Sequence, residues 1–189
     1  MRNIFITALF IAFAAPISAQ DFDRGVEAYR SGDYVTAMNE WRPLAEQGNM
    51  IAQYALGVMY DLGEGVAKDT KEAIKWYSLA AEQGYALAQY ALGVIYEKGE
   101  GITQDYKQAV QWYRQAAKQG YAIAQYALGV MYENGVGVLQ DNVIAHMWYN
   151  LSAANGNDLG GKNRNEVAIK MTSEEIFTAK AMARKCMSS

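Results

Sequence analysis

The chain has 189 residues, of which 51% are hydrophobic, and its formal net charge is −3 at pH 7. The acidic balance argues against a nucleic-acid partner, because surfaces that bind nucleic acid are rich in lysine and arginine. The single cysteine, Cys186, excludes an intramolecular disulfide, so packing has to stabilise the fold. We interpret Cys186 as a small buried helix residue in preference to a thiol that cross-links two chains.

Residues 1–19 predict a secretory signal peptide with cleavage after Ala19. Arg2 is the only charge before Asp21, and an apolar run of about a dozen residues lies between them. That run is shorter than the roughly 20 residues of a membrane-spanning helix, which favours a cleaved signal over an uncleaved anchor. The mature chain would be periplasmic or secreted, without stable membrane insertion. Its net charge would be −4, from 16 basic and 20 acidic residues once Arg2 is removed.

Residues 21–48 predict a helical hairpin that is a shortened copy of the repeats that follow. Its turn is cut back to Ser31-Gly32-Asp33, and Trp41 stands where the later copies have a tyrosine. Pro43 lies within the second helix of this hairpin. Because proline removes a backbone donor and clashes with the preceding turn, we expect a kink or an early end to that helix.

The heptapeptide Ala-Gln-Tyr-Ala-Leu-Gly-Val occurs three times without change, and each copy starts 36 residues after the last. This spacing predicts a tandem array whose three full repeats cover residues 49–84, 85–120 and 121–156. In the first half of a repeat, apolar residues recur at i, i+4 and i+8, the spacing of one buried stripe on an α-helix. The second half behaves in the same way. Each unit is therefore predicted to be a helix-turn-helix.

The two helices of each repeat are joined by a Gly-x-Gly loop followed by an aspartate. A dinucleotide-binding loop needs a third glycine and a preceding strand, so we interpret the two glycines as turn residues with positive φ. Asp69, Asp105 and Asp141 are predicted N-caps of the second helices. Glu72 and Gln108 complete a capping box in the first two repeats, whereas Ile144 predicts a slightly weaker helix start in the third.

Small and large residues alternate in a way that indicates close helix packing. Gly57 and Ala81, with their equivalents, are expected where bulk would force the helices apart. Trp76, Trp112 and Trp148 are expected to fill the space between units. After residue 156 the pattern changes, and residues 157–189 predict two C-terminal capping helices with fewer aromatic residues.

These residues resemble the Sel-1-like repeat family, a relative of the tetratricopeptide repeats, over nearly the whole mature chain. The second repeat carries the signature as Ala88-Gln89, Leu92-Gly93, Tyr96, Gly99-Glu100-Gly101, Asp105, Ala109, Trp112-Tyr113, Ala116-Ala117 and Gly120. The resemblance implies an all-α fold, a right-handed α-solenoid forming one domain over residues 20–189. It also implies a protein-binding adaptor and does not imply a reaction.

A cysteine-rich subgroup of this family is associated with β-lactam binding or hydrolysis, which makes a cell-wall or β-lactam-type hydrolase the alternative function. The present chain lacks cysteine pairs and the Ser-x-x-Lys, Ser-Asp-Asn and Lys-Thr-Gly motifs. His146 stands where the other repeats have Ile74 and Val110, which favours a packed imidazole over a catalytic one. We therefore expect a protein that is not an enzyme, with no catalytic residue, metal or cofactor.

A second apolar stripe on the first helices is the candidate partner site. In this family the first helices line the concave face, so the stripe suggests a shallow groove for a helix or an extended peptide. The alternative is that these residues only pack between hairpins. The partner could belong to a periplasmic assembly, or to a host if the protein is a secreted effector. The stripe consists of Ala55, Val58 and Met59, of Ala91, Val94 and Ile95, and of Ala127, Val130 and Met131.

Overall fold

The computed structural model describes residues 19–187 and consists there of ten α-helices without strands. The predicted signal peptide lies outside the described residues except for Ala19, which is the first residue of α1. The prediction of an all-α helical repeat fold is confirmed. The helices are α1 (Ala19–Arg30), α2 (Tyr34–Glu46), α3 (Met50–Leu62), α4 (Thr70–Glu82), α5 (Ala86–Lys98), α6 (Tyr106–Lys118), α7 (Ala122–Asn134), α8 (Asn142–Ala154), α9 (Asp158–Ala168) and α10 (Ser173–Met187).

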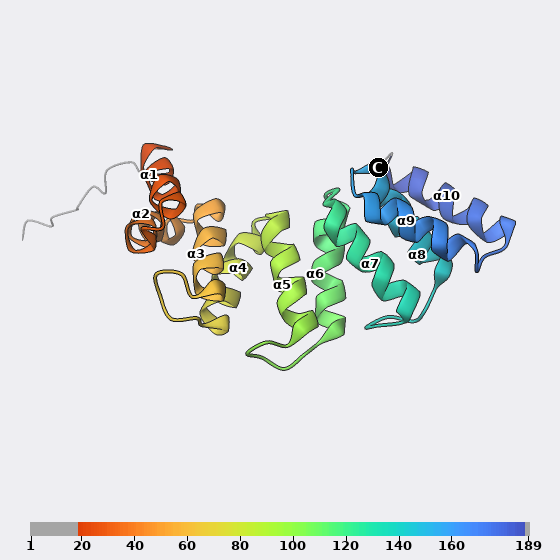
Figure 1. Ribbon diagram of the computed structural model, residues 1–189, viewed down its shortest axis with the longest axis horizontal. Coiled ribbons are helices and arrows are strands. Elements are labelled where there is room, and N and C mark those ends of the chain that lie inside the picture. The colour runs from red at the N-terminus through yellow and green to blue at the C-terminus, as the bar shows by residue number, and fades with distance from the viewer. Residues whose placement is uncertain (1–18, 188–189) are drawn as a thin grey trace, which may run out of the picture.

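The helices form consecutive hairpins that follow one another along the longest axis of the molecule (Figure 1). Each helix packs mainly against its neighbours in the chain, and both α9 and α10 pack against α8. The three long loops, α3–α4, α5–α6 and α7–α8, project from the same side, along the lower edge of Figure 1. The molecule is therefore an extended array in which one type of surface recurs with every repeat.

Each Gly-x-Gly loop is held by hydrogen bonds at both of its ends. Gly63 and Gly65 take positive φ values of 76° and 73°, as predicted for these turns. The Asp69 carboxylate accepts the backbone N–H groups of Lys71 and Glu72 and caps α4. The backbone N–H of Asp69 donates 2.9 Å to the carbonyl of Tyr60 on the preceding helix. The loop therefore ends in a hydrogen bond back to its own hairpin.

Three details of the predicted helix ends are wrong. The capping box would need the Asp69 N–H for the Glu72 side chain, but the Tyr60 carbonyl already accepts that hydrogen. The start of α8 is not weaker, because Asp141 makes the same two capping bonds as the other aspartates, at 2.9 and 3.0 Å. Pro43 also does not end α2, which continues to Glu46.

The two helices of each hairpin approach each other at a glycine that faces a tyrosine ring. A Cβ atom on Gly57 would lie 2.4 Å from the Tyr77 ring, and the same distance separates Gly93 from Tyr113 and Gly129 from Tyr149. Gly25 faces Trp41 in the same way in the first hairpin. The tyrosine of each Trp-Tyr pair thus fills the space within a hairpin, and glycine is required opposite it.

The tryptophans pack between repeats, as predicted. Trp112 of the second repeat contacts the buried cluster that contains Tyr77 and Ala81 of the first repeat. Trp148 does the same one repeat further on, against the cluster that contains Tyr113. Each repeat therefore covers apolar surface that its predecessor cannot bury alone.

A relay of buried glutamines also joins the repeats. Gln89 is only 3% exposed, and its amide donates 3.1 Å to the carbonyl of Ala81 at the end of the preceding repeat. Its own oxygen accepts a hydrogen bond of 2.8 Å from Gln119. Gln53 and Gln125 make the equivalent bonds. The glutamine of the repeated heptapeptide is therefore a polar link between units, which its regular spacing in the sequence alone did not reveal.

Helices α9 and α10 close the described end of the array. Lys170, after α9, donates a hydrogen bond of 2.8 Å to Glu133 of α7, and the same carboxylate accepts the Tyr149 hydroxyl. The interpretation of Cys186 as a buried residue is wrong, because its position near the end of α10 leaves it exposed. Among residues 19–187, no helix combines the length and hydrophobicity needed for a membrane crossing.

Candidate binding surface

The first helices of the hairpins, α1, α3, α5 and α7, carry two open pockets on what we call the first-helix face. The N-terminal pocket lies between α1 and α3 and has a volume of about 450 Å³. The central pocket lies between α5 and α7 and has a volume of about 550 Å³. The N-terminal pocket is lined by Phe22, Val26, Tyr29, Arg30, Trp41, Ile51, Tyr54, Ala55, Val58 and Tyr85. The central pocket is lined by Tyr90, Val94, Glu97, Lys98, Tyr106, Tyr113, Ile123, Tyr126, Ala127 and Val130.

The two pockets are built from equivalent positions two repeats apart. Residues of α3 correspond to residues of α7 that lie 72 positions later, so Ile51 matches Ile123. Residues of α1 match those of α5 at an offset of 68, because the α1–α2 turn is shorter. The contacts of Gly25 with Trp41 and of Gly93 with Tyr113 confirm this register. The corresponding pairs include Phe22 with Tyr90, Val26 with Val94, Arg30 with Lys98, Tyr54 with Tyr126, Ala55 with Ala127, and Val58 with Val130.

Five of the nine residues predicted for the groove line these pockets. Ala55 and Val58 lie in the N-terminal pocket, and Val94, Ala127 and Val130 lie in the central pocket. Ala91 is half-buried and packs against the cluster that contains Tyr77, outside both pockets. The structure therefore brings the smaller residues of the stripe together with aromatic rings.

The prediction that Met59, Ile95 and Met131 line the groove is wrong. Their exposed fractions are 0%, 6% and 2%, and each belongs to a core cluster. One residue along an α-helix rotates the side chain by about 100°, which turns these positions from the first-helix face towards the second helix of the hairpin. They hold the hairpin together and are not accessible to a partner.

Sequence reasoning missed the most exposed aliphatic residues that line the two pockets. Ile51 is 43% exposed and Ile123 is 45% exposed, and each lines a pocket. Each stands four residues before a stripe residue, Ala55 or Ala127, and so lies on the same face of its helix. That spacing was a usable signal. The sequence signal for Val26 and Arg30 of α1 was weaker, because the shortened α1–α2 turn shifts these residues relative to the 36-residue repeat period.

Tyrosines form the aromatic part of the first-helix face. The Tyr54 ring lies 5.3 Å from Tyr85, edge to face, and the Tyr90 ring lies 5.3 Å from Tyr121 in the same arrangement. Burial raises the pKa of each of these four hydroxyls above its ordinary value. They therefore stay protonated at neutral pH and can both donate and accept hydrogen bonds.

Two tyrosine–carboxylate pairs lie at the pockets. Tyr29 donates to Glu64, and burial together with this contact raises the pKa of Tyr29 to about 12. Tyr113 donates to Glu97, and burial is again the largest cause of its raised pKa, followed by the Glu97 contact. These hydroxyls are already engaged, so they position the pocket walls.

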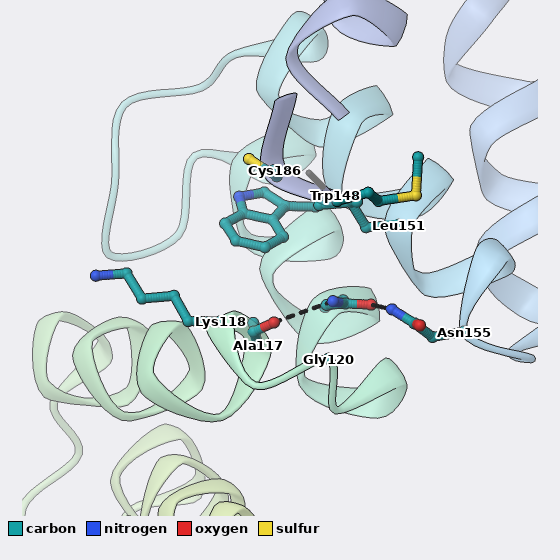
Figure 2. A pocket seen from close by; sticks show the side chains of 9 residues that line it. Ala117, Lys118, Gly120, Trp148, Leu151, Asn155 and Cys186 are labelled. Atoms are coloured by element: carbon teal, nitrogen blue, oxygen red, sulfur yellow. Dashed lines mark hydrogen bonds between the residues drawn. The ribbon is translucent and has the colours of Figure 1, made fainter. Parts of the chain in front are cut away.

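A third pocket, of about 710 Å³, lies away from the first-helix face, between the end of α6, the start of α7, α8 and the end of α10. Figure 2 shows Trp148 and Cys186 on its wall, with hydrogen bonds running from Ala117 to Asn155. Those bonds pass through Gln125 and belong to the glutamine relay. The polar groups at the centre of this pocket are therefore already hydrogen-bonded to one another where two repeats meet.

His146 lies inside the packing between α8 and the last two helices. It is 2% exposed, and its Nδ1 has no hydrogen-bond partner among the described residues. Burial lowers its pKa below 6.5, and the nearby cations Arg164 of α9 and Lys180 of α10 lower it further. A substrate cannot reach such an imidazole. Histidine, cysteine and carboxylate side chains also form no group of three or more that could hold a metal ion within residues 19–187.

The buried His146 gives an expected pH dependence of stability. Its lowered pKa means that the unfolded chain binds a proton more readily than the folded one. The free energy of unfolding should therefore be largest above pH 6.5 and should fall as the pH drops below that value. Urea denaturation between pH 7.5 and 5.5 measures this effect.

The control for this prediction is His146→Leu, which places an aliphatic residue where Ile74 and Val110 stand in the other repeats. The variant should lose the pH dependence in this window, in which aspartate and glutamate contribute little. An equal loss of stability in both proteins would contradict the assignment.

Tandem helical hairpins with interlocking repeats define this protein as an α-helical repeat protein. The model of the Sel1 repeat matches residues 51–85, 86–121 and 122–157, which together make up more than half of the chain. The chain therefore belongs to the Sel1 repeat family, whose members generally mediate protein–protein interactions.

Similar solved structures support the same assignment. A Sel1 repeat protein from Oxalobacter formigenes is 38% identical with a TM-score of 0.72, and the match covers 76% of this chain and 59% of that one. A protective antigen present in uropathogenic Escherichia coli strains, with an SLR fold, is 31% identical with a TM-score of 0.55. That match covers 89% of this chain and 45% of the antigen.

Among curated proteins, the chain is similar to an exopolysaccharide production negative regulator from Rhizobium meliloti (strain 1021), at 42% identity over 57 residues. The same-named protein from Rhizobium leguminosarum bv. viciae is 40% identical over the same length. These matches cover 30% of this chain and 21% of each regulator. The similarity thus extends over a fifth of the relatives' length.

Proposed function

We propose that this protein is an exported, non-enzymatic scaffold that binds a peptide or protein partner on its first-helix face. The observation that carries the proposal is the pair of apolar, aromatic pockets between α1 and α3 and between α5 and α7. Their residues include Ile51 and Ile123, which are exposed although the helices are otherwise well packed. Apolar surface of this kind, rimmed by polar groups, is typical of sites that bind other proteins.

Membership of the Sel1 repeat family supports a binding role over a catalytic one. The only histidine is buried, and the repeated carboxylates Asp69, Asp105 and Asp141 cap helices. Among residues 19–187, neither His146 nor these three aspartates therefore favours the hydrolase alternative. Export is supported by the sequence of residues 1–19, and an N-terminus at Gln20 in the protein recovered outside the cytoplasm would test it.

A photo-crosslinking amino acid at position 123 tests the proposal in intact producing cells. We expect Ile123 replaced by p-benzoylphenylalanine to yield a defined protein adduct, because Ile123 lines the central pocket and is 45% exposed. Gel analysis followed by mass spectrometry of the adduct identifies what is bound.

The matched control places the same group at Leu139, which is 90% exposed in the α7–α8 loop. It should not give the adduct obtained at position 123. Adducts of equal yield and identity at both positions would indicate contact without a specific surface and would contradict the proposal.

A further inference from the structure

The last helix, α10, is held on the array by a small contact. It packs mainly against α8, and not against α9, its neighbour in the chain. Of its fifteen residues only Ala179 and Ala183 are buried, whereas Phe177 is 68% exposed. Because this contact buries little apolar area, releasing α10 should cost less free energy than unfolding the whole array.

The surface of α8 beneath α10 differs from the equivalent surface of the second repeat. Met147 and Leu151 are buried and form one cluster with Ala183 of α10. The equivalent positions 36 residues earlier, on α6, are Gln111 and Gln115, and both are exposed. Release of α10 would therefore uncover an apolar surface that α6 does not have. It would also open the third pocket, because the end of α10 forms part of the wall beside Trp148 (Figure 2).

A buried histidine lies where α8 meets the last two helices. His146 is 2% exposed, and its Nδ1 has no hydrogen-bond partner among the described residues. Asn150, one turn later on α8, accepts a hydrogen bond of 3.1 Å from the Arg164 guanidinium of α9. This bond places a cation on the side of α8 that carries the imidazole. Lys180 of α10 is the second cation that acts on His146.

The carboxylates of the surrounding helices do not offset these two cations. Burial, Arg164 and Lys180 all lower the pKa of His146, in that order of size. The carboxylates either have partners of their own or lie exposed near a helix start. They are Glu133 with Lys170, Asp141 at the cap of α8, Glu166 with Lys162, Glu175 with the Thr172 N–H, and the exposed Asp158 and Glu174. A proton on His146 would therefore add a third positive charge to a site closed to water.

We propose that protonation of His146 releases α10 from α8, which makes α10 an acid-sensitive strap over the apolar surface of Met147 and Leu151. The proton is bound once α10 has left, because the imidazole then meets water. It hinders redocking, since burial of an imidazolium beside Arg164 is unfavourable. This strap is separate from the first-helix face, so its failure would leave the proposed function untouched.

The size of the effect follows from the titration of histidine in water. An exposed imidazole has a pKa of about 6.5. If the docked form binds no proton, the ratio of released to docked molecules should rise by about tenfold between pH 7.5 and pH 5.5. Any protonation of the docked form makes the rise smaller, so about tenfold is the upper limit.

Hydrogen–deuterium exchange tests the release when it is read by mass spectrometry at pH 7.5 and 5.5 and corrected for the intrinsic pH dependence of exchange. Protection of the α10 amides should fall several-fold at pH 5.5, and that of α5, in the middle of the array, should not. In His146→Leu, α10 should keep its protection at both pH values. His146→Val, which carries the residue of the second repeat at this position, replaces the leucine variant if circular dichroism shows that it does not fold.

Nuclear magnetic resonance follows the proton directly, because His146 is the only histidine in the chain. Its imidazole signals in untagged protein therefore report a single group. A histidine in water is roughly 90% protonated at pH 5.5. While α10 is docked, His146 should be protonated far less than that.

Four results would overturn the acid-sensitive strap. Unchanged protection of α10 in the wild type would show that acid does not release it. Equal losses in the wild type and in His146→Leu would assign the effect to another group. Equal losses in α5 and α10 would indicate unfolding of the whole array, and a fully protonated imidazole under a still protected α10 would show that docking tolerates the charge.

Discussion

Replacing Gly93 by alanine is expected to destabilise the protein, although alanine is normally the better helix former. The added Cβ would lie 2.4 Å from the Tyr113 ring, which is buried and cannot move aside without disturbing the hairpin. Overpacking of this kind should lower the free energy of unfolding by about 2 kcal/mol, even after the gain in helix propensity. Urea denaturation followed by circular dichroism measures the change.

The same substitution at Gly161 is the matched control. This glycine also lies inside a helix, α9, but a Cβ there would come no closer than 3.7 Å to Ala153, an ordinary contact. Gly161→Ala should therefore leave stability unchanged or raise it by up to about 1 kcal/mol. Two effects of the same sign and size would show that the glycine–tyrosine contact does not set the distance between the helices.

Replacing Gln89 by leucine is expected to cost about 1 to 2 kcal/mol, because it removes the two hydrogen bonds that the buried Gln89 side chain makes. The Ala81 carbonyl would lose the Gln89 amide but keep the Gly84 N–H, and the exposed Gln119 amide would exchange the Gln89 oxygen for water. The size of the two side chains is similar, so lost packing should contribute little. Equilibrium unfolding in urea of the wild type and the variant gives the difference.

A double-mutant cycle assigns this cost to the relay. Gln119→Leu alone should cost less, because Gln119 is exposed, and its effect should shrink once Gln89 is already replaced. Additive effects of the two substitutions would contradict a direct link.

The repeat period and the residues of special geometry made most of the fold predictable. A spacing of 36 residues between the heptapeptides defined the hairpins. The positive φ values of Gly63 and Gly65 were predicted directly from the Gly-x-Gly motif. The capping-box prediction was wrong because of a contact that the local sequence does not reveal. The Asp69 N–H is used by the carbonyl of Tyr60, nine residues earlier, and only the closed loop brings the two together.

The binding surface was less predictable because the first helices are apolar on more than one side. Val58 and Met59 are adjacent and equally hydrophobic, yet Met59 is fully buried and Val58 lines a pocket. Periodicity alone does not choose between two neighbouring stripes on such a helix. The contribution of α1 was missed because Val26 and Arg30 lie outside the repeated heptapeptide, and the shortened turn shifts them by four residues.

Hydroxyl-radical footprinting of the wild-type protein, with and without the partner that the cross-link identifies, tests most directly the claim that the first-helix face binds a partner. Partner binding should slow oxidation of Ile51, Tyr54, Ile123 and Tyr126, which line the two pockets. Oxidation of exposed residues elsewhere, such as Leu79, Leu139 and Phe177, should stay unchanged. Protection confined to those last residues, with the pocket residues still reactive, would place the partner on another surface and contradict this account.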